Sequence, residues 1–199
     1  MNKIVSRTLT VLCVALAAVL LGTVSVAQST FHVGYYVNAQ TPGVPDATLR
    51  INNPGSTYEN LCAMIYVFTA DQQMAECCGC LESPDNLNTL SVNNDLTANP
   101  LTSTIPTAGV IKIVSAAVNG APCDPTKNVW PNPTEDPVWL THWVDDLNIL
   151  GEDLVVKAVL SVPELVNLQS QCSFINILGS GHGICTCGSG SSSPVKKKK

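Results

Sequence analysis

The most strand-like hydrophobic run in the chain is Met64–Thr69, which is rich in β-branched and aromatic side chains. Apolar side chains occupy both parities of this run, which indicates a strand buried on both of its faces. The polar ADQQ that follows predicts a turn, and Met74–Cys80 then returns as a partner strand. Alternation along the second strand places Cys78 and Cys80 on one face and Cys77 on the other. We therefore predict a central hairpin that can be crosslinked on both faces.

Shorter segments with the composition of strands lie on either side of this hairpin, and turn residues separate them. These segments are Phe31–Val37, Ala47–Asn52, Leu87–Val92, Gly109–Val118 and Asp153–Leu160. We expect Leu81–Pro84 to be a connector, 93–106 to be a loop that crosses between sheets, and 119–137 to be an irregular excursion pinned by Cys123. The predicted fold class is mainly β, an antiparallel β-sandwich of Ig-like architecture with one C-terminal helix.

That helix is predicted at Val162–Leu178. Ser161 and Glu164 form a capping box at its start, and Gly179 is a natural terminator at its end. Its apolar residues recur at steps of three and four, which predicts one buried stripe. The stripe consists of Leu165, Leu168, Cys172 and Ile175. Because Cys172 lies on this stripe, a disulfide from it would tie the helix to the sheet.

The ends of the chain have the patterns of processing and linker segments. We predict that residues 1–27 are a signal peptide, with Lys3 and Arg7 before an apolar run and small residues before a cleavage site after Ala27. The alternative is an uncleaved anchor, for which the apolar run is short. Residues 28–187 form one disulfide-rich domain, and 188–199 form a Ser/Gly linker with a lysine tail. We expect export to the periplasm, the cell surface or the extracellular space, with no membrane span once the signal is removed.

Eight of the nine cysteines lie in the mature chain, and an even number in an exported protein indicates a disulfide framework. They are Cys62, Cys77, Cys78, Cys80, Cys123, Cys172, Cys185 and Cys187. The sequence leaves the pairing open. An alternative is a metal site in which Cys77, Cys80, Cys185 and Cys187 provide four thiolates, although the second pair is closer than zinc spacing usually is.

Charge is distributed unevenly along the chain. Ten Lys and Arg residues stand against 15 Asp and Glu, and four of the ten form the tail Lys196–Lys199. The acidic body argues against nucleic acid as the main partner. The tail suggests a tether to an anionic envelope polymer, docking to the acidic body of another copy, or a simple solvated end.

No catalytic or cofactor motif is recognisable, so we expect no enzyme and no cofactor. Ser180 lies in Gly-Ser-Gly and lacks the Gly-x-Ser-x-Gly pattern of hydrolases, and the three histidines are far apart. Trp130, Trp139 and Trp143 lie in one short region, where they could stack on sugar rings or be buried.

Four sequence features together resemble a group of uncharacterised, Cys-rich exported bacterial proteins. They are AMIYVF, the ECCGC cluster, the Ser-x-x-Glu-Leu helix start and the GSGHGICTC end. The resemblance implies no activity. The function that we expect is a structural or interaction protein, including a self-assembling filament or surface-layer subunit in which Phe31–Val37 pairs with a neighbour. The alternatives are a carbohydrate-binding module that uses the tryptophans and a metal-binding protein.

Overall fold

The computed structural model describes residues 29–55, 58–102, 104–118, 122–127, 130–131, 138–143, 150–154 and 156–180. These residues form two antiparallel sheets and one α-helix. In spatial order, the six-stranded sheet consists of β10 (Val156–Leu160), β1 (Ser29–Tyr36), β6 (Gly109–Ala117), β3 (Leu61–Thr69) and β4 (Met74–Glu82), with β7 (Trp130–Pro131) paired to β6. The four-stranded sheet consists of β5 (Leu87–Ser91), β2 (Thr48–Asn52), β8 (Val138–Trp143) and β9 (Leu150–Leu154).

The predicted central hairpin is confirmed as β3 and β4. β3 pairs with β4 on one side and β6 on the other, so it is an inner strand of the six-stranded sheet. All of its residues from Leu61 to Val67 are buried, as expected for a run that is apolar at both parities. The six-stranded sheet therefore has another layer on each of its faces.

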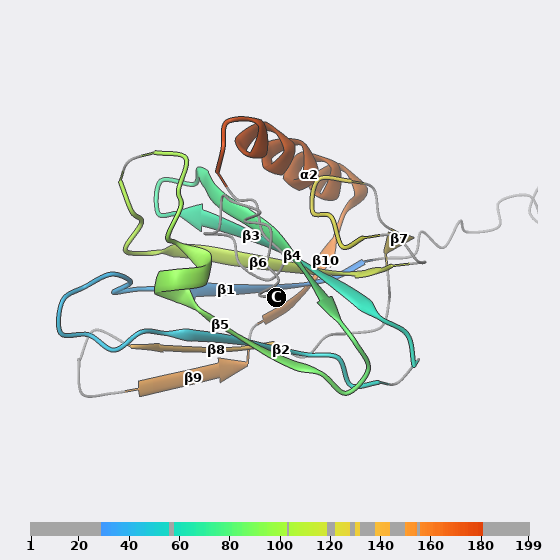
Figure 1. The fold of residues 1–199 in the computed structure, drawn as a ribbon, viewed down its shortest axis with the longest axis horizontal. Helices are drawn as coiled ribbons and strands as arrows, with labels where there is room; N and C mark the ends of the chain where they lie inside the picture. Colours follow the sequence, from blue (N-terminus) through green and yellow to red (C-terminus); the bar gives the residue numbers. More distant parts are fainter. Residues whose placement is uncertain are drawn as a thin grey trace, which may run out of the picture.

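The first of these layers is the four-stranded sheet. Ala63, Ile65 and Val67 of β3 lie in one core cluster with Leu49 and Ile51 of β2. The second layer is helix α2 (Val162–Ile177), which covers the opposite face of the six-stranded sheet (Figure 1). Here the even-numbered residues of β3 pack against the buried stripe of the helix, in a second cluster. Successive side chains of a strand point to opposite faces of its sheet, so the alternation along β3 predicts this arrangement.

The start and end of α2 match the sequence prediction closely. The side chain of Ser161 accepts a hydrogen bond from the backbone N–H of Glu164 at 3.3 Å, which caps the first turn. The Glu164 carboxylate does not complete the capping box; it pairs with Lys112 of β6 at 2.6 Å. Gly179 follows the helix with a φ of 94°, a left-handed conformation that glycine adopts readily.

Four predicted segments differ from the structure. The excursion at 119–137 is not wholly irregular, because it contains the short strand β7, which pairs with β6. Leu81–Pro84 is only partly a connector, because β4 continues to Glu82 along its partner β3. The segment Asp153–Leu160 is not one strand, because β9 ends at Leu154 and pairs with β8, whereas β10 begins at Val156 and pairs with β1 in the other sheet. The apolar alternation is the same on both sides of the break, so only the pairing partners separate the two strands. The predicted loop at 93–106 overlaps a single π-helical turn, η1 (Val92–Leu96), before the chain crosses to β6.

Candidate functional site

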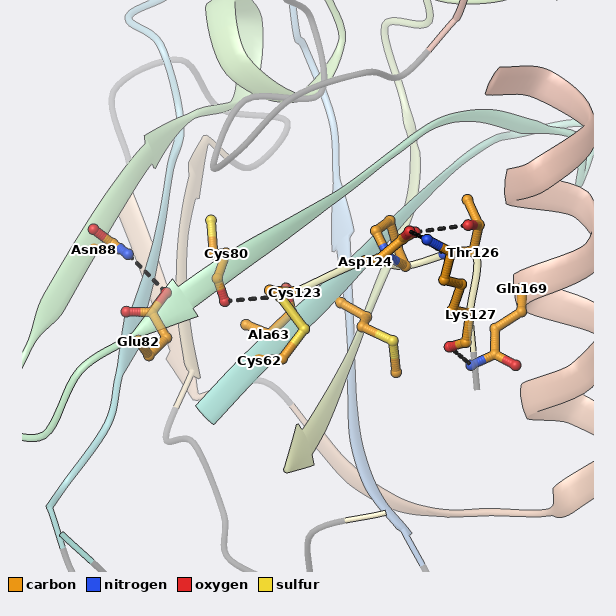
Figure 2. The surroundings of a disulfide bond; sticks show 12 residues. Cys62, Ala63, Cys80, Glu82, Asn88, Cys123, Asp124, Thr126, Lys127 and Gln169 are labelled. Atoms are coloured by element: carbon orange, nitrogen blue, oxygen red, sulfur yellow. Dashed lines mark hydrogen bonds and ion pairs between the residues drawn. A yellow bond between two sulfur atoms is a disulfide. The ribbon is translucent and has the colours of Figure 1, made fainter. Parts of the chain in front are cut away.

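The central hairpin is the origin of the covalent crosslinks. Cys77 of β4 bonds to Cys172 of α2. Cys62 of β3 bonds to Cys123 in the segment after β6, as Figure 2 shows. The predicted tie between helix and sheet and the predicted anchoring of the excursion by Cys123 are therefore confirmed. Cys78 and Cys80 are also in disulfides. They lie in the core cluster between the two sheets, opposite in direction to Cys77, so the hairpin is crosslinked on both faces.

The alternative metal set fits this arrangement poorly. Cys77 and Cys80 are both in disulfides, and a disulfide sulfur offers no thiolate to a metal ion. The other two members of the set, Cys185 and Cys187, lie outside the described residues. Within the ranges that the structure describes, no three His, Cys, Asp or Glu side chains gather as a metal site would require.

Gly79 lies between Cys78 and Cys80 on β4. Its lack of a side chain leaves space for the Cys62–Cys123 crosslink. A Cβ atom at Gly79 would lie 2.5 Å from the carbonyl oxygen of Cys123 and 2.9 Å from its Sγ. Any side chain here would push the crosslinked segment away from β4. This role was not predicted from the sequence, although a glycine inside a strand often marks the close approach of another backbone.

Segment 122–127 is held between the sheet and the helix by polar contacts as well. The Tyr66 hydroxyl donates to the carbonyl oxygen of Pro125 at 2.9 Å, and the Gln169 side chain of α2 donates to that of Lys127 at 2.6 Å. Burial opposes ionisation of Asp124, but hydrogen bonds from Thr126 and the Lys127 ion pair at 2.9 Å outweigh it and lower the pKa of Asp124. Polar contacts to the sheet and to the helix therefore hold the segment that carries the Cys62–Cys123 crosslink (Figure 2).

The most perturbed carboxyl group of the described residues is Glu76 on β4. It is fully buried on the face of the six-stranded sheet that meets the four-stranded sheet. Its Oε1 accepts a hydrogen bond from the Asn99 backbone N–H at 2.6 Å, whereas its Oε2 has no hydrogen-bond partner among the described residues. Burial raises the pKa of Glu76 to about 8 and also raises the pKa of nearby Tyr36. Glu76 is therefore a neutral carboxyl at neutral pH.

Perturbed carboxyl groups often mark functional sites, but the surroundings of Glu76 are structural. A groove of about 360 Å³ lies nearby, between the β3–β4 turn and residues 101–102 and 104–108. Met74 and Ala75 line this groove, whereas Glu76 is not among its described lining residues. A carboxyl group that neither a solute nor solvent reaches is unsuited to act on a substrate.

A second buried carboxyl group, Glu82, joins the end of the hairpin to its neighbours. Asn86 and Asn88 donate hydrogen bonds to its two carboxylate oxygens at 2.9 and 2.7 Å. Burial raises the pKa of Glu82, and these two hydrogen bonds counteract the shift. Asn88 lies on β5 of the four-stranded sheet, so this polar cluster links the two sheets.

The three tryptophans that lie close together in sequence are divided between the two sheets. Trp130 is in β7 and pairs with Ala117 of the six-stranded sheet. Trp139 and Trp143 are in β8 of the four-stranded sheet, where Trp139 pairs with Arg50. Their side chains lie outside the part of the chain that the structure describes, so sugar stacking stays a prediction.

Helix α2 has a second apolar stripe, on the side away from the sheet, which the sequence analysis missed. Its members are between 52% and 81% exposed, and they are Val162, Val166, Phe174, Ile177 and Leu178. Several of them recur at a spacing of four residues, which was visible in the sequence. The second stripe was not predicted because the buried stripe alone already accounts for an amphipathic helix.

Comparison with models of protein families, with curated proteins and with solved structures found no match for this chain. Among the described residues, no helix is long and apolar enough to cross a membrane. Any assignment of function therefore depends on the chain's own residues and contacts.

Proposed function

We propose that this protein is an exported structural or interaction protein, located at the cell surface or outside the cell. The observation that carries the proposal is the crosslinking of the central hairpin on both faces. Disulfides persist in oxidising compartments outside the cytosol, which supports export. In this proposal the two sheets form a β-sandwich of Ig-like architecture, and the disulfides keep it folded in a harsh environment.

The sizes of the closed loops support a role in durability. The two disulfides join cysteines separated by 61 and 95 residues along the chain. In the chain-entropy description, closing loops of this length stabilises a fold by about 4 to 5 kcal/mol each, as an upper value. A domain whose net stability is typically about 5 to 15 kcal/mol gains a large share of it from two such links.

The partners of Cys78 and Cys80 can be inferred by eliminating the cysteines whose pairing is already defined. Cys78 and Cys80 are in disulfides, and the other mature cysteines outside the two defined pairs are Cys185 and Cys187. We propose that these four residues pair with one another across the two segments. The C-terminal end of the domain would then be attached to the core between the sheets, and the lysine tail would begin close to the folded body.

Within this function, self-assembly is the variant that we favour. The sequence predicts a contact at Phe31–Val37, but β1 already lies between β10 and β6 of its own chain. Pairing with a neighbour through this strand would require the chain to give up its own partners. A different surface is therefore the better candidate for contact between copies, and the lysine tail remains a proposed tether to anionic envelope polymers.

The test is the intact mass of natively exported protein, measured with and without reduction, followed by peptide mapping of the disulfides. We expect a mature chain that starts at Gln28 and is lighter by eight hydrogens than its reduced form. The map should show the two defined links together with links from Cys78 and Cys80 to Cys185 and Cys187. Free thiols with stoichiometric bound metal would overturn the proposal in favour of a metal-binding protein.

Carbohydrate binding is the second candidate. The observation that favours it is the placement of Trp139 and Trp143 at the same parity of one strand, β8. Glycan-array binding that is lost on Trp139→Ala and Trp143→Ala would support it. An array that shows no binding by the wild-type protein would remove this candidate.

A further inference from the structure

The outward row of α2 consists of residues at a strict spacing of four. It runs through Val162, Val166, Ser170 and Phe174 to Leu178, the residue directly after α2, and all five side chains are exposed. Isolated exposed apolar residues are common on proteins, but a continuous row along one helix marks a contact surface. Ile177 lies beside the row and is 81% exposed, which widens the apolar area.

The row is symmetric about its centre, Ser170. Val166 and Phe174 lie four residues to either side of it, and Val162 and Leu178 lie eight residues to either side. A two-fold axis through Ser170 therefore places Val166 of each copy against the larger Phe174 of the other, whereas Val162 and Leu178 lie about 80° around the helix from Ser170 and flank the contact. The small serine at the centre allows the two helices to approach closely. Self-complementarity of this kind is the defining property of a two-fold interface.

Helix geometry permits this pairing. Rows at i±4 are inclined to the helix axis by about 26°, so two such rows run parallel when the helices cross at about 50°. This crossing is the commonest one in globular proteins. At this crossing the row runs parallel to its copy, with the two small Ser170 side chains at the point of closest approach.

Charge also favours a second copy of the same helix. The only charged residue in α2 is Glu164, and Lys112 of the same chain already pairs with it at 2.6 Å. No like charges would therefore meet when two copies of α2 pack together. An antiparallel arrangement also brings the partially positive start of each helix towards the partially negative end of the other.

The chain's own C-terminal residues are a poor match for this surface. Residues 181–199 are rich in Gly, Ser and Lys and contain only two aliphatic residues, Ile184 and Val195. The chain also leaves the helix towards β4, because the Ser180 hydroxyl contacts the carbonyl oxygens of Ala75 and Asn99 at 2.8 and 2.7 Å. This direction leads away from the outward row.

We propose that the outward row of α2 is a homotypic interface through which two copies of this chain pack about a two-fold axis at Ser170. This inference rests on the proposed function as a self-associating exported protein and names the surface involved. A helix of 16 residues is about 24 Å long and covers less than the roughly 800 Å² per partner of a standard interface. Association is therefore of micromolar strength or weaker and is effective where copies are concentrated on a surface.

Sedimentation velocity of the exported mature protein, from about 1 µM to about 1 mM, tests the interface. We expect a monomer–dimer equilibrium that Phe174→Glu weakens at least tenfold. The matched control is Leu87→Glu, which adds the same charge at an apolar residue of β5 that is 55% exposed, and it should leave the equilibrium unchanged. Circular dichroism of both variants should match the wild type, because both side chains are more than half exposed.

A crosslinking variant tests the position of the axis. Ser170→Cys should form a disulfide-linked dimer, since the two copies of residue 170 face each other. Thr89→Cys, at an exposed position on β5, should stay monomeric under the same conditions. Equal crosslinking of both variants would overturn the proposed axis.

The outcomes separate this inference from the proposed function. If the wild type associates and Phe174→Glu associates equally well, the interface lies elsewhere and only the inference is overturned. If the wild type is a strict monomer up to about 1 mM, both the inference and self-assembly as the function are overturned.

Discussion

Glu76 should make the protein less stable as the pH rises, and Glu76→Gln should remove that dependence. The carboxyl group is buried and retains its proton up to a pKa of about 8, whereas its ordinary value is 4.5. Between these two pH values the folded chain binds more protons than the unfolded chain. The free energy of unfolding therefore falls as the pH rises through this window, and the loss is complete above about pH 8.

The magnitude follows from the two pKa values. Each pKa unit corresponds to 1.36 kcal/mol, so the interval from 4.5 to about 8 corresponds to about 4 to 5 kcal/mol. The hydrogen bond from the Asn99 backbone N–H to Oε1 is retained by the glutamine oxygen, so the substitution keeps the shape and this contact. We therefore expect Glu76→Gln to match the wild type near pH 4.5 and to exceed it by about 3 to 5 kcal/mol at pH 8.5.

The assay is urea denaturation of the wild type and the variant at intervals between pH 4.5 and 8.5, with the disulfides intact. The quantity to compare is the difference in unfolding free energy between the two proteins at each pH. This difference removes the contribution of Glu82, whose raised pKa acts in the same direction, and of Asp124, whose lowered pKa acts in the opposite direction. Glu59→Gln, at an exposed position, is the control for removing one carboxylate.

A difference that stays constant across this pH range would refute the reasoning. So would a variant that is less stable than the wild type at pH 8.5, because the buried carboxylate would then be stabilised by a partner. In either case Glu76 would be ionised at low cost inside the fold, and burial would not be the dominant influence on its pKa.

Four further variants test the packing of the sheet and helix by urea denaturation. Replacing both Cys77 and Cys172 with alanine should lower the unfolding free energy by about 2 to 5 kcal/mol, and an unchanged value would mean that this link does not constrain the unfolded chain. Gly109→Ala should cost about 1 to 3 kcal/mol, because its Cβ would lie 1.9 Å from the Phe68 carbonyl oxygen; a neutral result would show that β3 and β6 can separate locally. Ser161→Ala should cost about 1 kcal/mol by removing the cap of α2, and Ser161→Asp should retain most of the stability.

The local patterns of the sequence were sufficient for the parts of the fold that depend on neighbours along the chain. Alternation in β3 and β4 correctly predicted two buried faces, with Cys77 directed oppositely to Cys78 and Cys80. The steps of three and four in α2 correctly predicted its buried stripe, and its cap was correct at Ser161. Strand and helix periodicities are set by backbone geometry, so they can be read without knowing what lies opposite.

Tertiary structure decided everything that depends on which segments meet. The pairing of Cys62 with Cys123, the close approach at Gly79 and the burial of Glu76 all involve residues far apart in sequence. The same holds for the division of one apolar run into β9 and β10, which belong to different sheets.

The two stripes of α2 show the physical reason for this division. The sequence determined by itself that α2 is a helix with apolar residues at regular intervals, because hydrogen bonding within the helix sets the period. It did not determine which stripe packs on the sheet and which remains exposed, because this choice depends on the position of the six-stranded sheet in the folded protein. Side-chain periodicity is a local property of the chain, whereas burial is a property of the assembled layers.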